Sequence, residues 1–144
     1  MLCGARGAAR RALGDPITAA TSVYVADTLG EMGLFYRLSP FCFLGATLVP
    51  KGGHNPLEPA LLNCAVLAGP HRDNARLAFA AVLDAQGFGT VESSADIARA
   101  AERLLSDPQA AARAGEAART GAVTLQGAVA KSIALLKEML DART

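Results

Sequence analysis

The sequence has little charge, few aromatic side chains and no excess of charge of one sign. Charged residues make up 19% of its 144 residues and aromatic residues 5%, with 14 Lys and Arg against 13 Asp and Glu. A chain with 51% hydrophobic residues and so little charge can bury a core, which excludes an intrinsically disordered protein. The near-neutral balance also lacks the basic excess of nucleic-acid-binding proteins, so no nucleic-acid partner is expected.

The sequence also lacks a long hydrophobic run. Its longest uncharged apolar stretch, Leu38 to Val49, is interrupted by Pro40 and is shorter than the roughly 20 residues that cross a bilayer. No transmembrane segment is therefore expected in this chain.

Cysteine is scarce, with Cys3, Cys42 and Cys64 as the three examples and no C-x-x-C pair. Cys42 and Cys64 lie inside apolar runs, which is typical of small buried hydrophobic residues in a reducing compartment. Together with Cys64, His54 and His71 lack the ligand spacing of a zinc site, so no metal is expected.

What the sequence does have is an alternation of short apolar runs and helical patterns. Such an order predicts right-handed crossovers and a parallel sheet, and therefore the α/β class. The expected strands are 23–26, 41–45, 64–68 and 89–92, and the expected helices between them are 29–38, 55–62 and 74–86.

The C-terminal part is alanine-rich and helical. It begins near Ser94, breaks at Asp107-Pro108 and continues to about Arg119, with a turn expected at Gly121. One apolar stripe, expected to pack on the domain's own sheet or on a neighbour, marks the last helix. It consists of Leu125, Val129, Ile133, Leu136 and Leu140. We therefore expect three parts, which are an upstream segment at 1–22, an α/β part at 23–92 and C-terminal helices at 93–144.

Two loops stand out as candidate sites, because ligands of open α/β sheets bind outside the carboxyl ends of the strands. The first spans 27–31, where Gly30 bares the backbone at a helix start and would let an anion approach the unpaired amides. The alternative interpretation is a plain capping box made by Thr28 and Glu31.

The second loop spans 51–58 and contains the glycine pair Gly52-Gly53, which allows positive φ and close backbone approach. Asn55 and Glu58 can point toward a ligand there, and a carboxylate can accept hydrogen bonds from two vicinal ribose hydroxyls. The alternative is a tight turn followed by a reciprocal helix cap made by the same two residues.

Three blocks of sequence resemble a known family. KGGHNPLEPA at 51–60, ADTLGEMGLFYRL at 26–38 and GPH at 69–71 resemble the C-terminal part of 3-deoxy-D-manno-octulosonic acid (Kdo) transferases. The resemblance implies a partial Rossmann-like parallel sheet, the C-terminal half of a GT-B glycosyltransferase, followed by C-terminal helices.

The family transfers Kdo from CMP-Kdo to a lipid A precursor, lipid IVA, in lipopolysaccharide biosynthesis at the inner face of the inner membrane. The resemblance implies that CMP-Kdo is the donor and that there is no further cofactor. The implied CMP contacts are Leu29, Gly30, Glu31, Asn55, Pro56, Leu57 and Glu58. The implied phosphate or sugar contacts are Lys51, Gly52, Gly53 and His54.

In this family the catalytic base lies in the N-terminal domain, so we expect no catalytic residue in this chain and no transferase activity from it alone. The acceptor and the membrane surface would be contacted through that other domain. The sequence departs from the family at Asp73 and Ala75, where an aromatic residue usually flanks Asn74, and at Ala46-Thr47, where Gly-Ser is commoner.

Two alternatives remain open from the sequence. The chain could be a fragment of another GT-B enzyme, such as a different glycosyltransferase or a nucleotide-sugar epimerase. It could instead be a non-enzymatic interaction module whose apolar C-terminal helix docks a partner.

Overall fold

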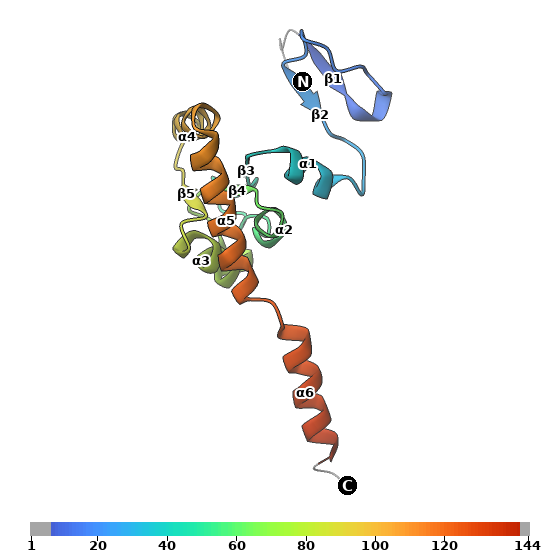
Figure 1. Ribbon diagram of the computed structural model, residues 1–144, viewed down its shortest axis with the longest axis vertical. Helices are drawn as coiled ribbons and strands as arrows, with labels where there is room; N and C mark the ends of the chain where they lie inside the picture. The colour runs from blue at the N-terminus through green and yellow to red at the C-terminus, as the bar shows by residue number, and fades with distance from the viewer. Residues whose placement is uncertain (1–6, 142–144) are drawn as a thin grey trace. The chain divides into compact units, whose positions relative to one another are not determined.

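The computed structural model describes residues 7–141, which form two compact units that divide between Met32 and Gly33 (Figure 1). The smaller unit is built on two short parallel strands, β1 (Ala8–Arg10) and β2 (Val23–Val25). A 3-10 helix, η1 (Arg11–Leu13), follows β1. The strand expected at 23–26 is confirmed, whereas β1 was not expected, because its Ala-Ala-Arg sequence has none of the β-branched or aromatic residues typical of strands.

The larger unit contains a parallel sheet of three strands in the order β3 (Phe41–Phe43), β4 (Ala65–Ala68) and β5 (Phe88–Thr90). Cys42 pairs with Val66, and Leu67 pairs with Gly89. The predicted α/β class with parallel strands is confirmed. Four of the eight strand ends lie one or two residues inside the expected bounds, and β5 begins one residue earlier than expected. Such differences are the usual uncertainty of element boundaries.

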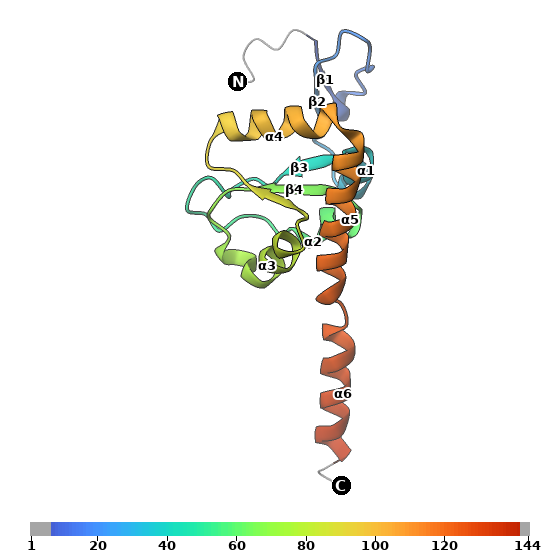
Figure 2. The ribbon, with the colours of Figure 1, turned by 60° about the vertical axis from the view of Figure 1, so that its left-hand side comes forward.

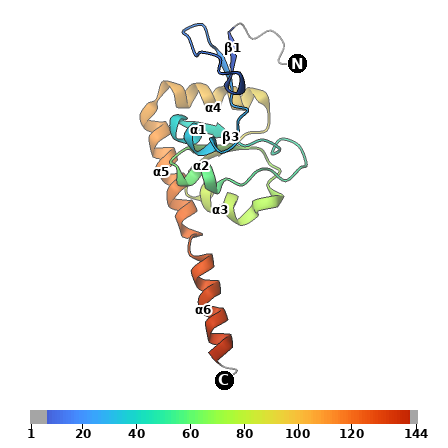
Figure 3. The ribbon, with the colours of Figure 1, turned by 90° about the vertical axis from the view of Figure 1, so that its right-hand side faces the viewer.

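Helices cover both faces of this sheet. Figures 2 and 3 show α4 along one face and α2 and α3 along the other. The helices of the chain up to α4 are α1 (Met32–Leu38), α2 (Leu57–Leu61), η2 (Asp73–Ala75), α3 (Arg76–Asp84) and α4 (Ser94–Ser106).

The core lies between β4 and the helices on the α2 and α3 side. All four residues of β4 are fully buried, and Val66 and Ala68 join a hydrophobic cluster with Phe79 and Val82 of α3. A strand buried on both faces is expected to be apolar at every position, as this one is. The central strand therefore anchors the loops that follow β3 and β4.

Helix α5 (Pro108–Thr124) packs against α2, α3 and β4, and it is longer than the sequence indicated. The turn expected at Gly121 was wrong, because this glycine is buried inside the helix. A Cβ there would collide with the carbonyl oxygen of Ala81, and one at Gly115 would collide with that of Asn63. Both glycines serve close helix packing rather than chain reversal.

Helix α6 (Ala128–Asp141) carries the last part of the predicted apolar stripe. Ile133 and Leu136 are 49% and 58% exposed, so these two side chains do not pack on the sheet. The side chains of Val129 and Leu140 lie outside what the structure describes. Over residues 7–141, none of the helices combines the length and the hydrophobicity needed to span a bilayer.

Candidate functional site

The glycine pair of the predicted second loop lies between β3 and α2, at the carboxyl edge of the larger unit's sheet. Gly52 and Gly53 have φ values of 82° and 72°, in the left-handed region that only glycine enters without strain. Both glycines are buried, and the Gly53 amide donates to the carbonyl oxygen of Ala46 at 3.1 Å. Lys51 and His54, on either side of the pair, are exposed.

The segment after the glycines leads directly into α2. The Asn55 side chain accepts a hydrogen bond from the Leu57 amide at 3.0 Å, so it caps the helix start as the alternative interpretation of this loop proposed. The reciprocal half of that cap is not among the described hydrogen bonds. Pro56 is buried, Leu57 is half-buried, and Glu58 is exposed in the first turn. Glu58 is therefore open to a ligand.

Thr47 ties the loop after β3 to the loop after β4. Its hydroxyl donates to the carbonyl oxygen of Leu44 at 2.6 Å and accepts from the Gly69 amide at 2.8 Å, while its own carbonyl accepts from the His71 amide at 3.0 Å. Thr47 is fully buried, so these bonds are shielded from water. The two loops thus meet at one edge, as parallel strands require.

Asn74 of η2 is a second connection between these loops, and its role was not predicted from the sequence. Its backbone amide donates to the carbonyl oxygen of Gly52 at 3.0 Å. Its side-chain Nδ2 donates to the carbonyl oxygens of Lys51 at 3.1 Å and Gly53 at 3.2 Å. The available signals were its place at the start of the helix expected at 74–86, soon after the carboxyl end of a strand, and the aromatic residue that usually flanks it in the family.

Arg72 links the ends of β4 and β5. Its Nε donates to the carbonyl oxygen of Gly69 at 2.6 Å, and its guanidinium also bonds the hydroxyl of Thr90. The guanidinium carbon lies 5.9 Å from the ring centre of Phe79, within cation–π range. Partial burial lowers the pKa of Arg72, although the side chain stays charged at neutral pH.

The predicted first loop belongs to the smaller unit. Leu29 is fully exposed, and Gly30 has a φ of 82° with open space on the side where a Cβ would lie. The helix expected to begin at Leu29 begins instead at Met32, so the capping box of Thr28 and Glu31 is wrong. The physical reason is that Gly30 has a left-handed φ of 82°, with which a right-handed helix cannot run through this position.

Glu31 is held by an arginine that follows β1. Arg11 donates through Nε to Oε2 of Glu31 at 2.9 Å and through Nη2 to Oε1, which is a two-pronged ion pair. The Thr28 hydroxyl also donates to Oε2. The hydrogen bonds from Arg11 and then from Thr28 lower the pKa of Glu31 to about 2, so its carboxylate is ionised at neutral pH.

Asp27 makes a similar connection in the same unit. Its carboxylate accepts from the Ala12 amide at 2.9 Å and forms an ion pair with Arg10. The Ala12 hydrogen bond and then the Arg10 hydrogen bond lower the pKa of Asp27. Arg10 and Arg11 could not be paired with their carboxylates from sequence, because 17 and 20 residues separate the partners.

The two predicted segments thus lie in different compact units. The structure brings 51–58 together with Thr47 and Asn74, and it brings Glu31 together with Arg11 and Thr28.

Neither cysteine of the larger unit forms a disulfide. Cys64 is fully buried, as expected, and Cys42 is partly buried. The two thiols interact directly, and this contact and burial raise the pKa of Cys42. Cys3 lies outside the described residues. Over residues 7–141, no group of three His, Cys, Asp or Glu side chains could hold a metal ion.

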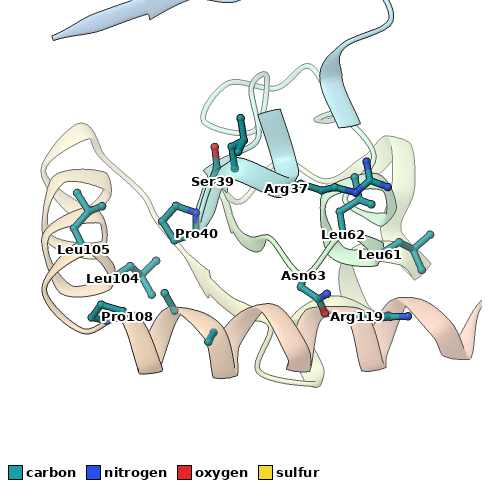
Figure 4. Close-up of a pocket in the computed structure, with 13 residues that line it drawn as sticks. Arg37, Ser39, Pro40, Leu61, Leu62, Asn63, Leu104, Leu105, Pro108 and Arg119 are labelled. Carbon is teal, nitrogen blue, oxygen red and sulfur yellow. The ribbon is translucent and has the colours of Figure 1, made fainter. Parts of the chain in front are cut away.

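A cavity of about 890 Å³ lies at the amino edge of the larger unit's sheet, opposite the loops that follow β3 and β4 (Figure 4). Pro40 and Asn63, which come just before β3 and β4, place it at the amino ends of the strands. Leucines and prolines form much of its wall, with Arg37 and Arg119 among the polar residues. None of the predicted site residues lines this cavity.

Comparison with known proteins gives relatives of one kind. No family model matches the chain. The chain is 37% identical over 122 residues to the 3-deoxy-D-manno-octulosonic acid transferase of Haemophilus influenzae, covering 84% of this chain and 29% of that protein. It is 29% identical over 121 residues to the transferase of the same name from Bordetella pertussis, covering 82% of this chain and 28% of that protein.

A solved structure agrees with these sequence relatives. The crystal structure of the C-terminal CMP-Kdo binding domain of WaaA from Acinetobacter baumannii matches with a TM-score of 0.74 at 32% identity, covering 81% of this chain and 61% of that one. With its parallel strands, two-faced helical cover and loops at the carboxyl edge, the chain is of the GT-B glycosyltransferase class, as part of a C-terminal domain.

Within that class, the chain belongs to the 3-deoxy-D-manno-octulosonic acid transferases and corresponds to their C-terminal part. The resemblance expected from the three sequence blocks is thereby confirmed. The chain spans less than a third of the length of the curated relatives named above, at 29% and 28%.

Proposed function

We propose that this chain is the donor-binding part of a Kdo transferase and that it binds CMP-Kdo through the loop at 51–58. The observation that carries the proposal is the likeness to a solved CMP-Kdo binding domain, at 32% identity over 81% of the chain. The loop at 51–58 supports it, because buried left-handed glycines lead into an exposed Asn55 and Glu58 at the carboxyl edge of the sheet.

Each segment has a role in this proposal. Glu58 accepts hydrogen bonds from the ribose hydroxyls, since an exposed carboxylate is acceptor-only and can receive both. In the smaller unit, taken by itself, the open space beside Gly30 would let an anion approach the backbone, while Arg11 offsets the negative charge of Glu31. Lys51 and His54 face solvent, where they can contact the phosphate or the sugar.

The reaction of the whole enzyme is then an inverting transfer of Kdo from CMP-Kdo to lipid IVA. A base outside this chain deprotonates an acceptor hydroxyl, the resulting oxygen attacks the anomeric carbon, and CMP leaves with the electrons of the broken bond. This chain binds the donor and stabilises the departing phosphate. On this account the acceptor and the inner face of the inner membrane are contacted through the N-terminal domain, and this chain alone has no transferase activity.

Calorimetric titration of the chain with CMP tests the proposal. We expect saturable binding that Glu58→Gln and Asn55→Ala weaken by about tenfold each, the loss that accompanies one hydrogen bond to a ligand. Glu102→Gln on α4, an exposed glutamate away from the loop, serves as the matched control and should bind as the unaltered chain does. Equal affinity in all four proteins, or stronger binding of uridine nucleotides than of CMP, would contradict it and favour another GT-B enzyme.

One observation favours the alternative of an interaction module. Ile133, Leu136 and Met139 of α6 are about half exposed, at 49%, 58% and 59%. If polar substitutions of these three residues abolished binding to a partner protein while Glu58→Gln left nucleotide binding unchanged, the module interpretation would replace the proposed function.

A further inference from the structure

The backbone of residues 51–53 has a conformation that the loop cannot hold by itself. Gly52 and Gly53 are consecutive left-handed residues, and glycine in a free loop samples many other conformations. The carbonyl groups of Gly52 and Gly53 also need hydrogen-bond donors, because both residues are buried.

A single residue supplies those donors. The backbone amide of Asn74 donates to the carbonyl oxygen of Gly52 at 3.0 Å, and its Nδ2 donates to the carbonyl oxygens on either side, of Lys51 at 3.1 Å and of Gly53 at 3.2 Å. Because both side-chain partners are acceptors, the amide nitrogen and not the oxygen must point toward them.

The fit between Asn74 and Gly52 is also one of shape. A Cβ added at Gly52 would lie 2.5 Å from Cγ of Asn74, far inside van der Waals contact. The flat amide group therefore rests directly on the glycine backbone. Leucine at position 74 would keep a similar volume but lose the side-chain donor, and aspartate would place a carboxylate against the carbonyl oxygens of Lys51 and Gly53.

We propose that Asn74 is a positioning residue that orients Asn55 and Glu58 for recognition of the ribose of a cytidine nucleotide, an inference that rests on the proposed function. The path is short. Asn74 holds the carbonyl groups of 51–53, and the conformation of the glycine pair sets the direction in which the chain leaves the loop. The Asn55 side chain then accepts a hydrogen bond from the amide of Leu57, the first residue of α2, which directly precedes Glu58. Asn74 itself acts on the loop and not on the nucleotide.

The test uses two probes, CMP and 2′-deoxy-CMP, titrated into the full chain. A carboxylate aligned on the ribose makes the unaltered chain prefer CMP, by about tenfold for one hydrogen bond. Asn74→Ala and Asn74→Leu should abolish this preference by weakening CMP binding about tenfold, while 2′-deoxy-CMP binding changes little. Asp73→Asn, which changes an exposed neighbour, is the matched control and should keep the preference.

The outcomes separate the two proposals. If the unaltered chain binds no CMP, the proposed function itself fails. If the chain binds CMP with a ribose preference and the Asn74 variants keep that preference, the inference about Asn74 is overturned, even where the variants unfold at lower temperature. Equal weakening of both probes also overturns it, because that result assigns Asn74 a structural role only.

Discussion

The two segments that resemble CMP-contacting sequences are held by different forces. In the smaller unit, Glu31 is fixed by its ion pair with Arg11, whose side chain is 40% exposed, and the neighbouring Asp27 is paired with Arg10. In the larger unit, the loop at 51–58 is fixed by uncharged hydrogen bonds from Asn74 and by the buried Thr47. Exposed ion pairs are weak and sensitive to salt and pH, whereas uncharged hydrogen bonds depend on side-chain shape, and those of the buried Thr47 are also shielded from water. The segment of the smaller unit is therefore the adjustable segment, and the loop of the larger unit is the rigid segment.

The largest loss of stability in the rigid segment is expected for Thr47→Val. Valine keeps the shape of threonine but leaves the Leu44 carbonyl and the Gly69 amide without their buried partner. We expect the free energy of unfolding to fall by about 3 kcal/mol, since each buried unsatisfied group costs about 1–3 kcal/mol. Urea denaturation measures this loss, and Thr47→Ser, which keeps the hydroxyl, should lose about 1 kcal/mol. Equal losses in the two variants would mean that the methyl group and not the hydroxyl matters.

The next largest effect is expected for Gly52→Ala. An alanine would have to adopt a φ of 82° and would crowd the Asn74 amide. The left-handed conformation costs a residue with a Cβ about 1–2 kcal/mol, and we expect a total destabilisation of about 2 kcal/mol together with weaker CMP binding. Thermal unfolding followed by circular dichroism gives the first value and titration the second. Unchanged stability would show that the loop is not held in this conformation.

A smaller effect of opposite sign is expected for Ala46→Gly. Ala46 has a φ of 61°, so the alanine that replaces the family's usual glycine is strained. Relief of this strain, less the entropy that glycine loses on folding, should stabilise the chain by about 0.5 kcal/mol. The same substitution at Ala98, in the exposed part of α4, should destabilise it by a similar amount, and both are measured by denaturant unfolding. Destabilisation at both positions would rule out the strain.

The smallest effect is expected at the ion pair of the adjustable segment. The pKa of Glu31 is about 2 in the folded chain, below its ordinary 4.5, so the unfolded chain binds the proton more readily. The stability from this pair is therefore present above about pH 5 and is lost as the pH falls from about 4.5 to 2. Carbon-detected NMR titration of the carboxyl group should give a midpoint near pH 2 that rises with added salt. A midpoint near 4.5 at low salt would show that Arg11 does not bind Glu31.

Periodicity and composition were sufficient for the larger unit's sheet. Apolar runs at 41–45 and 64–68 indicated strands, and the structure contains β3 and β4 there, with β4 fully buried and β3 half-buried. The loop at 51–58 was singled out correctly as a glycine turn that leads into a helix. These features depend on neighbouring residues, which is why the sequence contains enough information to predict them.

Features that depend on distant residues could not be predicted in this way. The ion pair of Glu31 with Arg11 joins residues that lie 20 positions apart in the chain. Gly121 was expected to turn the chain, but it lies inside α5 against the backbone of Ala81. The hydrogen bonds of Asn74 to the glycine loop span more than 20 residues as well. In each case a tertiary contact outweighs the local pattern.

The central claim, that a cytidylate binds at the carboxyl edge of the sheet, is tested most directly by titrating ¹⁵N-labelled chain with CMP and following the backbone amides by NMR. The account predicts that the largest shifts fall on Gly52, Gly53, Leu57 and Glu58. Shifts confined to the lining of the cavity at the other edge of the sheet, around Asn63 and Arg119, would contradict it.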